Sequence, residues 1–253
     1  MKKLIVVLIA LLVLSSTPLA AKDGNPEPPT ASGNIALVGS TTATTTPDIV
    51  STSIPRGYCH LDSTKQPDKT ILQNYKELNK GVNEVLLAFA DCQQLKLSRS
   101  GEKSTIDDYG YVLAPTSLID KKLNMSVEDY LSRMQELKKK KGAEVFNKEF
   151  DEKKDFIKEK LPLLKVNEPT FLGIFAQDKN AIYSAILHNI ETETGDRIYL
   201  VGVEAITLIG KKPVYFYLWK RYQGNSTLHG LQKIIACWVD RNCKDNLKSM
   251  NSS

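Results

Sequence analysis

The chain of 253 residues lacks the short motifs that identify most catalytic sites. It has no C-x-x-C, no H-E-x-x-H, no G-x-S-x-G and no G-x-G-x-x-G sequence. These absences argue against a dithiol redox centre, a zinc-protease helix, a hydrolase nucleophile elbow and a dinucleotide-binding loop. We therefore assign no catalytic, cofactor-binding or metal-binding residues, and we expect a protein that is not an enzyme.

Histidine is scarce as well. His60, His188 and His229 are the three histidines, and none has the spacing of paired metal ligands. We interpret His60 as a surface or hydrogen-bonded side chain. A reactive Cys–His site formed by His60 and Cys92 is the weaker alternative.

A strong net charge is also missing. Lys and Arg number 34 against 29 Asp and Glu, so the net charge is +5, and it falls to about +3 without Lys2 and Lys3. So small a surplus argues against nucleic acid as a partner. Acids also match bases locally, as in residues 148–154 (KEFDEKK), which we interpret as a solvated helix face.

Long apolar runs are confined to the start of the chain. Lys2 and Lys3 precede an apolar run of 11 residues at 4–14, and small residues follow at 20–21. This layout predicts a signal peptide over 1–21, because a transmembrane helix needs about 20 apolar residues. No cysteine lies near the cleavage site. We expect a periplasmic or extracellular protein without a lipid anchor, and no transmembrane anchor in the mature chain.

Residues 22–53 contain no aromatic side chain and are rich in proline and threonine. Such a segment buries too little apolar surface to offset the entropy of ordering it. We therefore predict a disordered linker over 22–53. The remaining residues, 54–253, are long enough for a single globular domain with one core.

Hydrophobic periodicity in this domain predicts three helices. The first begins at Pro67 and stops at Gly81, the second spans 126–161 with a kink or break at Gly142, and the third follows Thr227. Strand-like runs occupy the segments between them: 54–61, 85–90, 107–114, 170–176, 181–192, 197–209 and 213–222. The last four are joined by short connections, which permit only antiparallel neighbours. We predict an α+β fold in which helices flank a largely antiparallel β-sheet, an α/β/α sandwich of order β-α-β-β-α-β-β-β-β-α.

Four cysteines in an exported chain indicate disulfides, and four cysteines allow three pairings. Cys59 and Cys92 sit at the edges of two expected strands, which makes their pairing plausible. Cys237 and Cys243 would lie about 9 Å apart along an unbroken helix, beyond the reach of a disulfide. They can pair only if the helix stops near residues 241–242.

The last expected strand carries Tyr215, Tyr217 and Trp219 on one face, because side chains alternate along a strand. Such a stripe usually packs under a helix, but an exposed stripe would be a binding face. The same alternation indicates that Asp107 and Asp108 point apart and do not share one site.

Several short motifs resemble those of an uncharacterised family of exported proteobacterial proteins. They are Pro55-x-Gly57-Tyr58-Cys59, Phe89-Ala90-Asp91-Cys92, Asp108-Tyr109-Gly110, and Thr227-Leu228 leading to Trp238-Val239. The element order also resembles the PsbP/DcrB-like α/β/α sandwich, named for an extrinsic subunit of photosystem II. The resemblance covers about residues 54–247, and its motifs are structural. It implies a non-enzymatic accessory or assembly role at a membrane surface and transfers no ligand residues.

The sequence thus favours a secreted or periplasmic binding or accessory protein, whose partner is an unknown envelope protein or a small ligand. The alternatives are an envelope hydrolase with a dispersed active site and a structural component of the envelope. A pocket with converging polar groups and displaced pKa values would favour the hydrolase. An exposed apolar patch would favour the binding protein.

Overall fold

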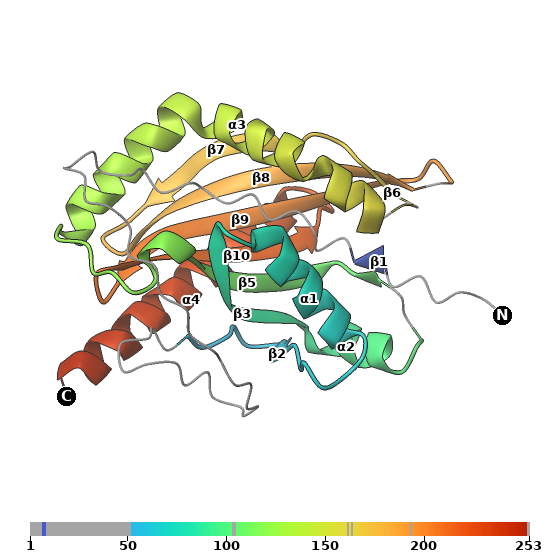
Figure 1. Cartoon of the computed structure of the whole chain (residues 1–253), viewed down its shortest axis with the longest axis horizontal. Coiled ribbons are helices and arrows are strands. Elements are labelled where there is room, and N and C mark those ends of the chain that lie inside the picture. The colour runs from blue at the N-terminus through green and yellow to red at the C-terminus, as the bar shows by residue number, and fades with distance from the viewer. Residues whose placement is uncertain are drawn as a thin grey trace, which may run out of the picture.

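The structure, a computed structural model, combines a curled antiparallel sheet, open like half a barrel, with four α-helices in its described part (Figure 1). The expected α+β class and the antiparallel sheet are therefore confirmed. The signal peptide and the linker expected from the sequence lie outside the described residues, apart from Val7–Leu8 and residues 52–53. The structure describes Val7–Leu8 and residues 52–102, 105–160, 162, 164–192 and 194–251, with side chains of the last helix as far as Asn246.

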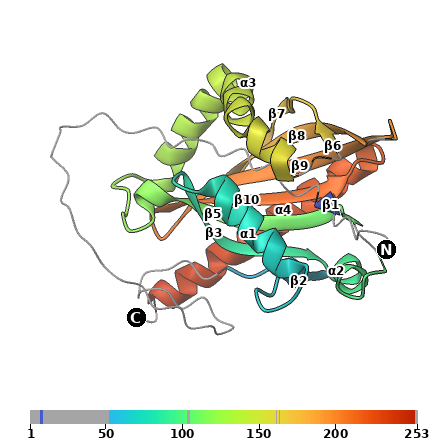
Figure 2. The same cartoon turned by 45° about the vertical axis from the view of Figure 1, so that its right-hand side comes forward.

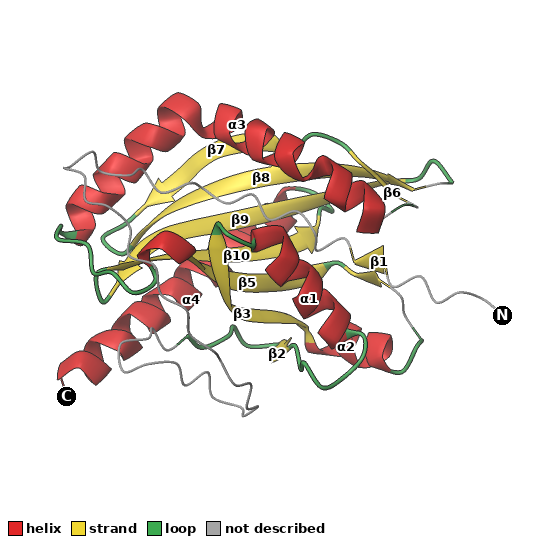
Figure 3. Ribbon diagram, in the orientation of Figure 1, coloured by secondary structure: helices red, strands yellow, loops and turns green. Residues whose placement is uncertain are grey.

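The main sheet has eight strands in the order β2-β3-β5-β10-β9-β8-β6, and β7 pairs with a second stretch of β8 (Figure 3). All of its neighbouring strands are antiparallel. β1 (Val7–Leu8) and β4 (Thr105–Ile106) form a separate parallel pair. The strands of the main sheet are β2 (Tyr58–His60), β3 (Asn83–Asp91), β5 (Asp108–Pro115), β6 (Leu164–Val166), β7 (Thr170–Gln177), β8 (Ala181–Thr192), β9 (Arg197–Ile209) and β10 (Lys212–Arg221).

The α-helices are α1 (Asp68–Asn79), α2 (Cys92–Arg99), α3 (Val127–Lys160) and α4 (Asn225–Asn251), and a short 3₁₀ helix, η2, spans Thr116–Leu118. The element order expected from the sequence lacks β1, α2, β4 and β6. α2 has only eight residues, too few to display a helical period. Its start is fixed by Asp91, whose carboxylate accepts a hydrogen bond from the Gln94 backbone N–H at 2.9 Å.

The helices lie on both faces of the sheet (Figure 2). α1 and α3 pack on the face that carries Tyr111 and Tyr217, whereas α4 packs on the opposite face against Phe216. Tyr217 and Phe216 are neighbours on β10 and point to opposite sides, as strand alternation requires. The sheet is therefore buried on both faces over its central strands.

α4 also forms hydrogen bonds with Ser53, the residue just before the expected start of the domain. The Ser53 backbone N–H donates a hydrogen bond to the Asn242 side chain at 2.7 Å, and the Trp238 indole N–H donates to the Ser53 carbonyl oxygen at 2.5 Å. Ser53, one residue before the boundary expected from the sequence, is thus already bound to the folded domain.

α3 is a single helix of 34 residues, so of the kink or break expected at Gly142 the break does not occur. Gly142 is buried where α3 crosses β7, and a Cβ atom there would lie 2.7 Å from the Phe171 ring. The glycine therefore permits close approach of helix and strand.

Candidate functional site

The aromatic stripe considered from the sequence is not a binding surface. Tyr215, Tyr217 and Trp219 are at most 1% exposed and belong to the core under α1 and α3. Tyr217 stacks on Tyr111 with ring centres 4.9 Å apart, and the Trp219 indole N–H donates to the Tyr111 hydroxyl at 2.9 Å. The stripe thus packs under helices, the more usual of the two arrangements considered from the sequence, and the alternative of an exposed binding face at these residues does not occur, because α1 and α3 cover it.

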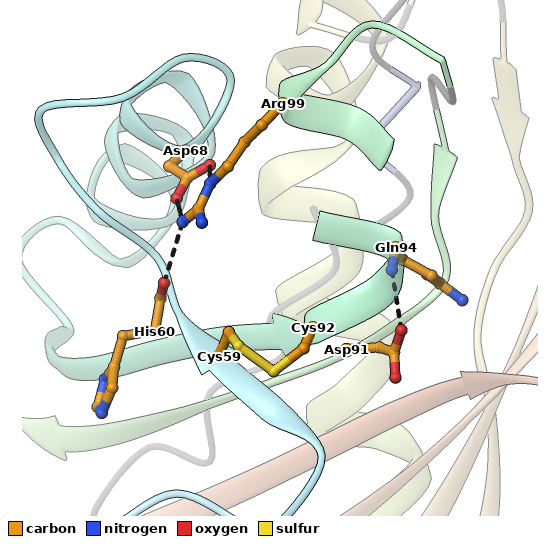
Figure 4. Close-up of a disulfide and its surroundings, with 7 residues drawn as sticks. All are labelled: Cys59, His60, Asp68, Asp91, Cys92, Gln94 and Arg99. Carbon is orange, nitrogen blue, oxygen red and sulfur yellow. Dashed lines mark hydrogen bonds and ion pairs between the residues drawn. A yellow bond between two sulfur atoms is a disulfide. The ribbon is translucent and has the colours of Figure 1, made fainter. Parts of the chain in front are cut away.

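Cys59 and Cys92 form the disulfide expected from the sequence (Figure 4). The bond ties β2 to the first residue of α2. Nearby, Arg99 at the end of α2 forms an ion pair with the buried Asp68 at the start of α1 and donates to the His60 carbonyl oxygen at 3.3 Å. His60 contributes its backbone to this network while its ring points away from the sulfur atoms. The cluster joins three elements and offers no thiolate for a Cys–His site.

The second cysteine pair considered from the sequence does not form. α4 continues through residues 241–242, so Cys237 and Cys243 stay on one unbroken helix, and both are free thiols. Asp107 and Asp108, in contrast, diverge as expected. Asp107 pairs with Arg221 at 2.8 Å, and Asp108 pairs with Lys220 at 2.5 Å.

A cluster of charged side chains lies between α3 and the sheet. Lys138 of α3 and Glu204 of β9 form an ion pair in which both side chains are at most 4% exposed. The Glu204 carboxylate also accepts hydrogen bonds from the Ser184 and Tyr217 hydroxyls at 2.7 and 2.8 Å. Lys138 Nζ lies 5.1 Å from the centre of the Phe146 ring. The charges of this pair are thus compensated within the core.

Glu149, further along the same side of α3, is compensated less well. Its side chain is 7% exposed, and neither carboxylate oxygen has a hydrogen-bond partner among the described residues. Burial raises the pKa of Glu149 to about 8, although the charges of Lys153 and Lys138 oppose that rise. The sequence analysis was therefore wrong to place residues 148–154 on a solvated face as a whole.

A small cavity of about 10 Å³ adjoins these groups. Lys138, Gly142, Phe146 and Glu149 are among the residues that line it. A cavity of this size holds about one water molecule and no organic substrate. The charged cluster is therefore closed in this structure.

His188 of β8 is a further buried polar group. It is 0% exposed, its ring centre lies 5.0 Å from that of Trp219, and neither ring nitrogen has a partner within the described part of the chain. Burial lowers the pKa of His188 to about 3, so the imidazole is neutral.

An open groove lies at the edge of the sheet, between the C-terminal half of α3 and strands β6 and β8. We call it the α3–β6 groove. Its volume is about 680 Å³, within the range of small-molecule sites. It combines apolar side chains, three lysines, two acids and one threonine: Phe150, Lys154, Asp155, Ile157, Lys158, Pro162, Leu164, Lys165, Val166, Glu191 and Thr192.

The spacing of residues along α3 and along β6 determines which side chains face the groove. Phe150 and Ile157 are seven residues apart on α3 and therefore face the same way about 10 Å apart. Leu164 and Val166 alternate along β6 and face the same side. These apolar side chains belong to the buried core at the base of the groove, and the exposed Lys154, Lys158 and Lys165 lie around it.

Neither the charged cluster beneath α3 nor the α3–β6 groove was predicted from the sequence. Glu204 did give a signal, since it is the only charged residue of β9 after Arg197. The groove gave none, because it depends on how residues 150–158 meet 164–166 and 191–192 in space. Within the groove, Glu191 forms an ion pair with Lys165 at 3.5 Å.

Comparisons and spatial searches give no further assignment. No protein-family model, curated protein or solved structure matches this chain. Across the described ranges, no group of three or more His, Cys, Asp or Glu side chains is placed to hold a metal ion. None of the helices in that part combines the length and the apolar character that crossing a bilayer requires.

Proposed function

We propose that this protein is an exported, non-enzymatic binding protein that takes a small amphipathic molecule in the α3–β6 groove. The observation that carries the proposal is the open volume of about 680 Å³, whose lining combines apolar side chains at its base with charged ones around it. Sites for small molecules have this combination of apolar lining and a few polar groups.

Export is supported by two independent features. The first 21 residues have the layout of a signal peptide. The disulfide between Cys59 and Cys92 suits an oxidising compartment such as the periplasm or the medium. We include in the proposal the α/β/α-sandwich architecture and the PsbP/DcrB-like resemblance, which suggest an accessory role beside a membrane.

One feature favours the alternative, an envelope hydrolase. Ser184, Lys138 and Glu149 converge beneath α3, and the pKa of Glu149 is displaced. However, the Ser184 hydroxyl donates to Glu204 and is fully buried, and the adjoining cavity has room for about one water molecule. We therefore place the ligand in the groove and assign the charged cluster to the support of α3.

The proposal is tested with the neutral apolar dye N-phenyl-1-naphthylamine, titrated into the full chain at pH 6. We expect saturable binding with one dye per chain. Val166→Trp fills the groove and should weaken binding by about tenfold or more, which corresponds to at least 1.4 kcal/mol. Leu172→Trp is the matched control, because Leu172 is an exposed apolar residue of β7 outside the groove. Equal binding by both variants would refute the assignment.

A further inference from the structure

Two buried glutamates stand in different surroundings beneath α3. Glu204 accepts hydrogen bonds from Lys138, Ser184 and Tyr217. Glu149 accepts none from the described residues, although its side chain is more than nine-tenths buried and lines the small cavity. A buried carboxylate without hydrogen-bond donors is costly, whereas a buried carboxylic acid is tolerated far better.

Charged and titratable groups from three elements face Glu149. α3 contributes Lys153, Lys138 and Glu152, β9 contributes Glu204, and β10 contributes the hydroxyls of Tyr215 and Tyr217. Lys138 already compensates Glu204. Lys153 is itself held partly out of water, and burial lowers its pKa. The surroundings therefore favour the protonated form of Glu149 at neutral pH, in agreement with its pKa of about 8.

Glu149 also sits where the groove begins. Phe150, Lys154 and Ile157, on the next two turns of α3, form the helical wall of the groove. Any outward movement of the helix after Glu149 therefore widens the groove. The preceding half of α3 is held separately, since Lys138 stays paired with Glu204 and Phe146 stacks on Phe171 at 5.3 Å.

We propose that Glu149 is a proton-operated latch. While its carboxyl group is protonated, it holds the C-terminal half of α3 in place as one wall of the groove; when that group ionises, the helix moves outward and the groove loses the wall that contacts the ligand. The inference rests on the proposed function, because it concerns the regulation of the same groove. An ionised Glu149 gains stabilisation only if water reaches it, and outward movement of α3 admits that water.

The experiment compares the full chain with Glu149→Gln, which keeps the shape of the side chain but cannot ionise. N-phenyl-1-naphthylamine is titrated at pH 6, 7, 8 and 9. Full coupling to one proton predicts that the dissociation constant of the native chain rises by up to about tenfold between pH 7 and 9. The dissociation constant of Glu149→Gln for the dye should not change over this pH range. Identical pH profiles for the two proteins would overturn the latch.

Hydrogen exchange provides a readout that does not depend on the dye. Amides of residues 150–160 in the native chain should lose protection relative to Glu149→Gln at pH 9 but not at pH 6, while α4 behaves alike in both. If Glu149→Gln does not fold, Lys153→Met replaces it. Removing that positive charge should move the native transition to higher pH, and an unchanged transition contradicts the latch.

The two proposals fail in different ways. Dye binding in the groove without any pH dependence would support the proposed binding function and disprove the latch. Absence of groove binding at pH 6 removes the binding function, while hydrogen exchange still decides whether Glu149 controls α3.

Discussion

At the scale of single residues, the stability of this fold depends on how each buried charge is compensated. Glu204 has a cation and two hydroxyl donors, whereas Glu149 has neighbouring lysines but no hydrogen bond within the described chain. The two residues therefore respond differently to mutation and to pH.

Lys138→Met leaves Glu204 buried without its cation. We expect the free energy of unfolding to fall by about 3–5 kcal/mol, the usual cost of breaking a buried ion pair from one side. Lys139→Met is the control, because Lys139 is exposed and forms no ion pair among the described residues. It should change stability by no more than about 0.5 kcal/mol. Urea unfolding measures both, and equal effects would show that the pair does not stabilise the core.

Glu149 should make the stability of the protein depend on pH. Its pKa rises from the ordinary 4.5 to about 8 on folding, so the folded state binds more protons than the unfolded state between these values. The stability of the native chain should therefore fall through this window as pH rises. Glu149→Gln lacks this loss, so its advantage in unfolding free energy should grow from pH 5 to pH 8 and then level off. Parallel stability curves for the two proteins would contradict the assignment.

At the scale of elements, hydrophobic periodicity and chain composition predicted most of the helices and strands. The predicted boundaries of the strands and of α3 are close to those observed, because burial of one face imposes a fixed period on the apolar residues. α2 was missed because two turns carry too little pattern. A kink or break at Gly142 was predicted from glycine's low helix propensity, but the helix continues through Gly142, where it packs against Phe171.

The two helical glycines Gly142 and Gly230 make a matched pair. A Cβ at Gly142 would meet the Phe171 ring at 2.7 Å, whereas a Cβ at Gly230 would meet nothing within 4 Å among the described residues. Gly230→Ala should raise stability by about 0.5–1 kcal/mol through helix propensity. Gly142→Ala should lower it, because overpacking costs about 1–3 kcal/mol. Thermal unfolding distinguishes them, and stabilisation by both would disprove the close helix–strand contact.

At the scale of the whole molecule, the two edges of the sheet differ. The disulfide and the Arg99–Asp68 ion pair tie down the edge at β2, whereas the groove opens beside β6 at the other edge. The disulfide could be predicted from the sequence, because Cys59 and Cys92 lie at the edges of two expected strands. The groove could not be predicted, because its walls are brought together only by the path of the sheet.

This separation predicts that stability and binding can be changed independently. Cys59→Ala combined with Cys92→Ala removes a bridge across 33 residues and should cost about 2–4 kcal/mol. Dye binding at the groove should be unchanged while the variant remains folded. Cys237→Ser, at an exposed free thiol, should alter neither property. A loss of dye binding in the folded double variant would show that the two edges are coupled.

The central claim is that the α3–β6 groove is where this protein binds its ligand, and the most direct test is to locate the bound dye. Amide chemical shifts of the full chain are recorded with and without N-phenyl-1-naphthylamine at pH 6. We predict shift changes concentrated at residues 150–158, 164–166 and 191–192, and absent in Val166→Trp. Changes centred on exposed apolar residues elsewhere, such as Leu172 and Tyr199, would contradict the account.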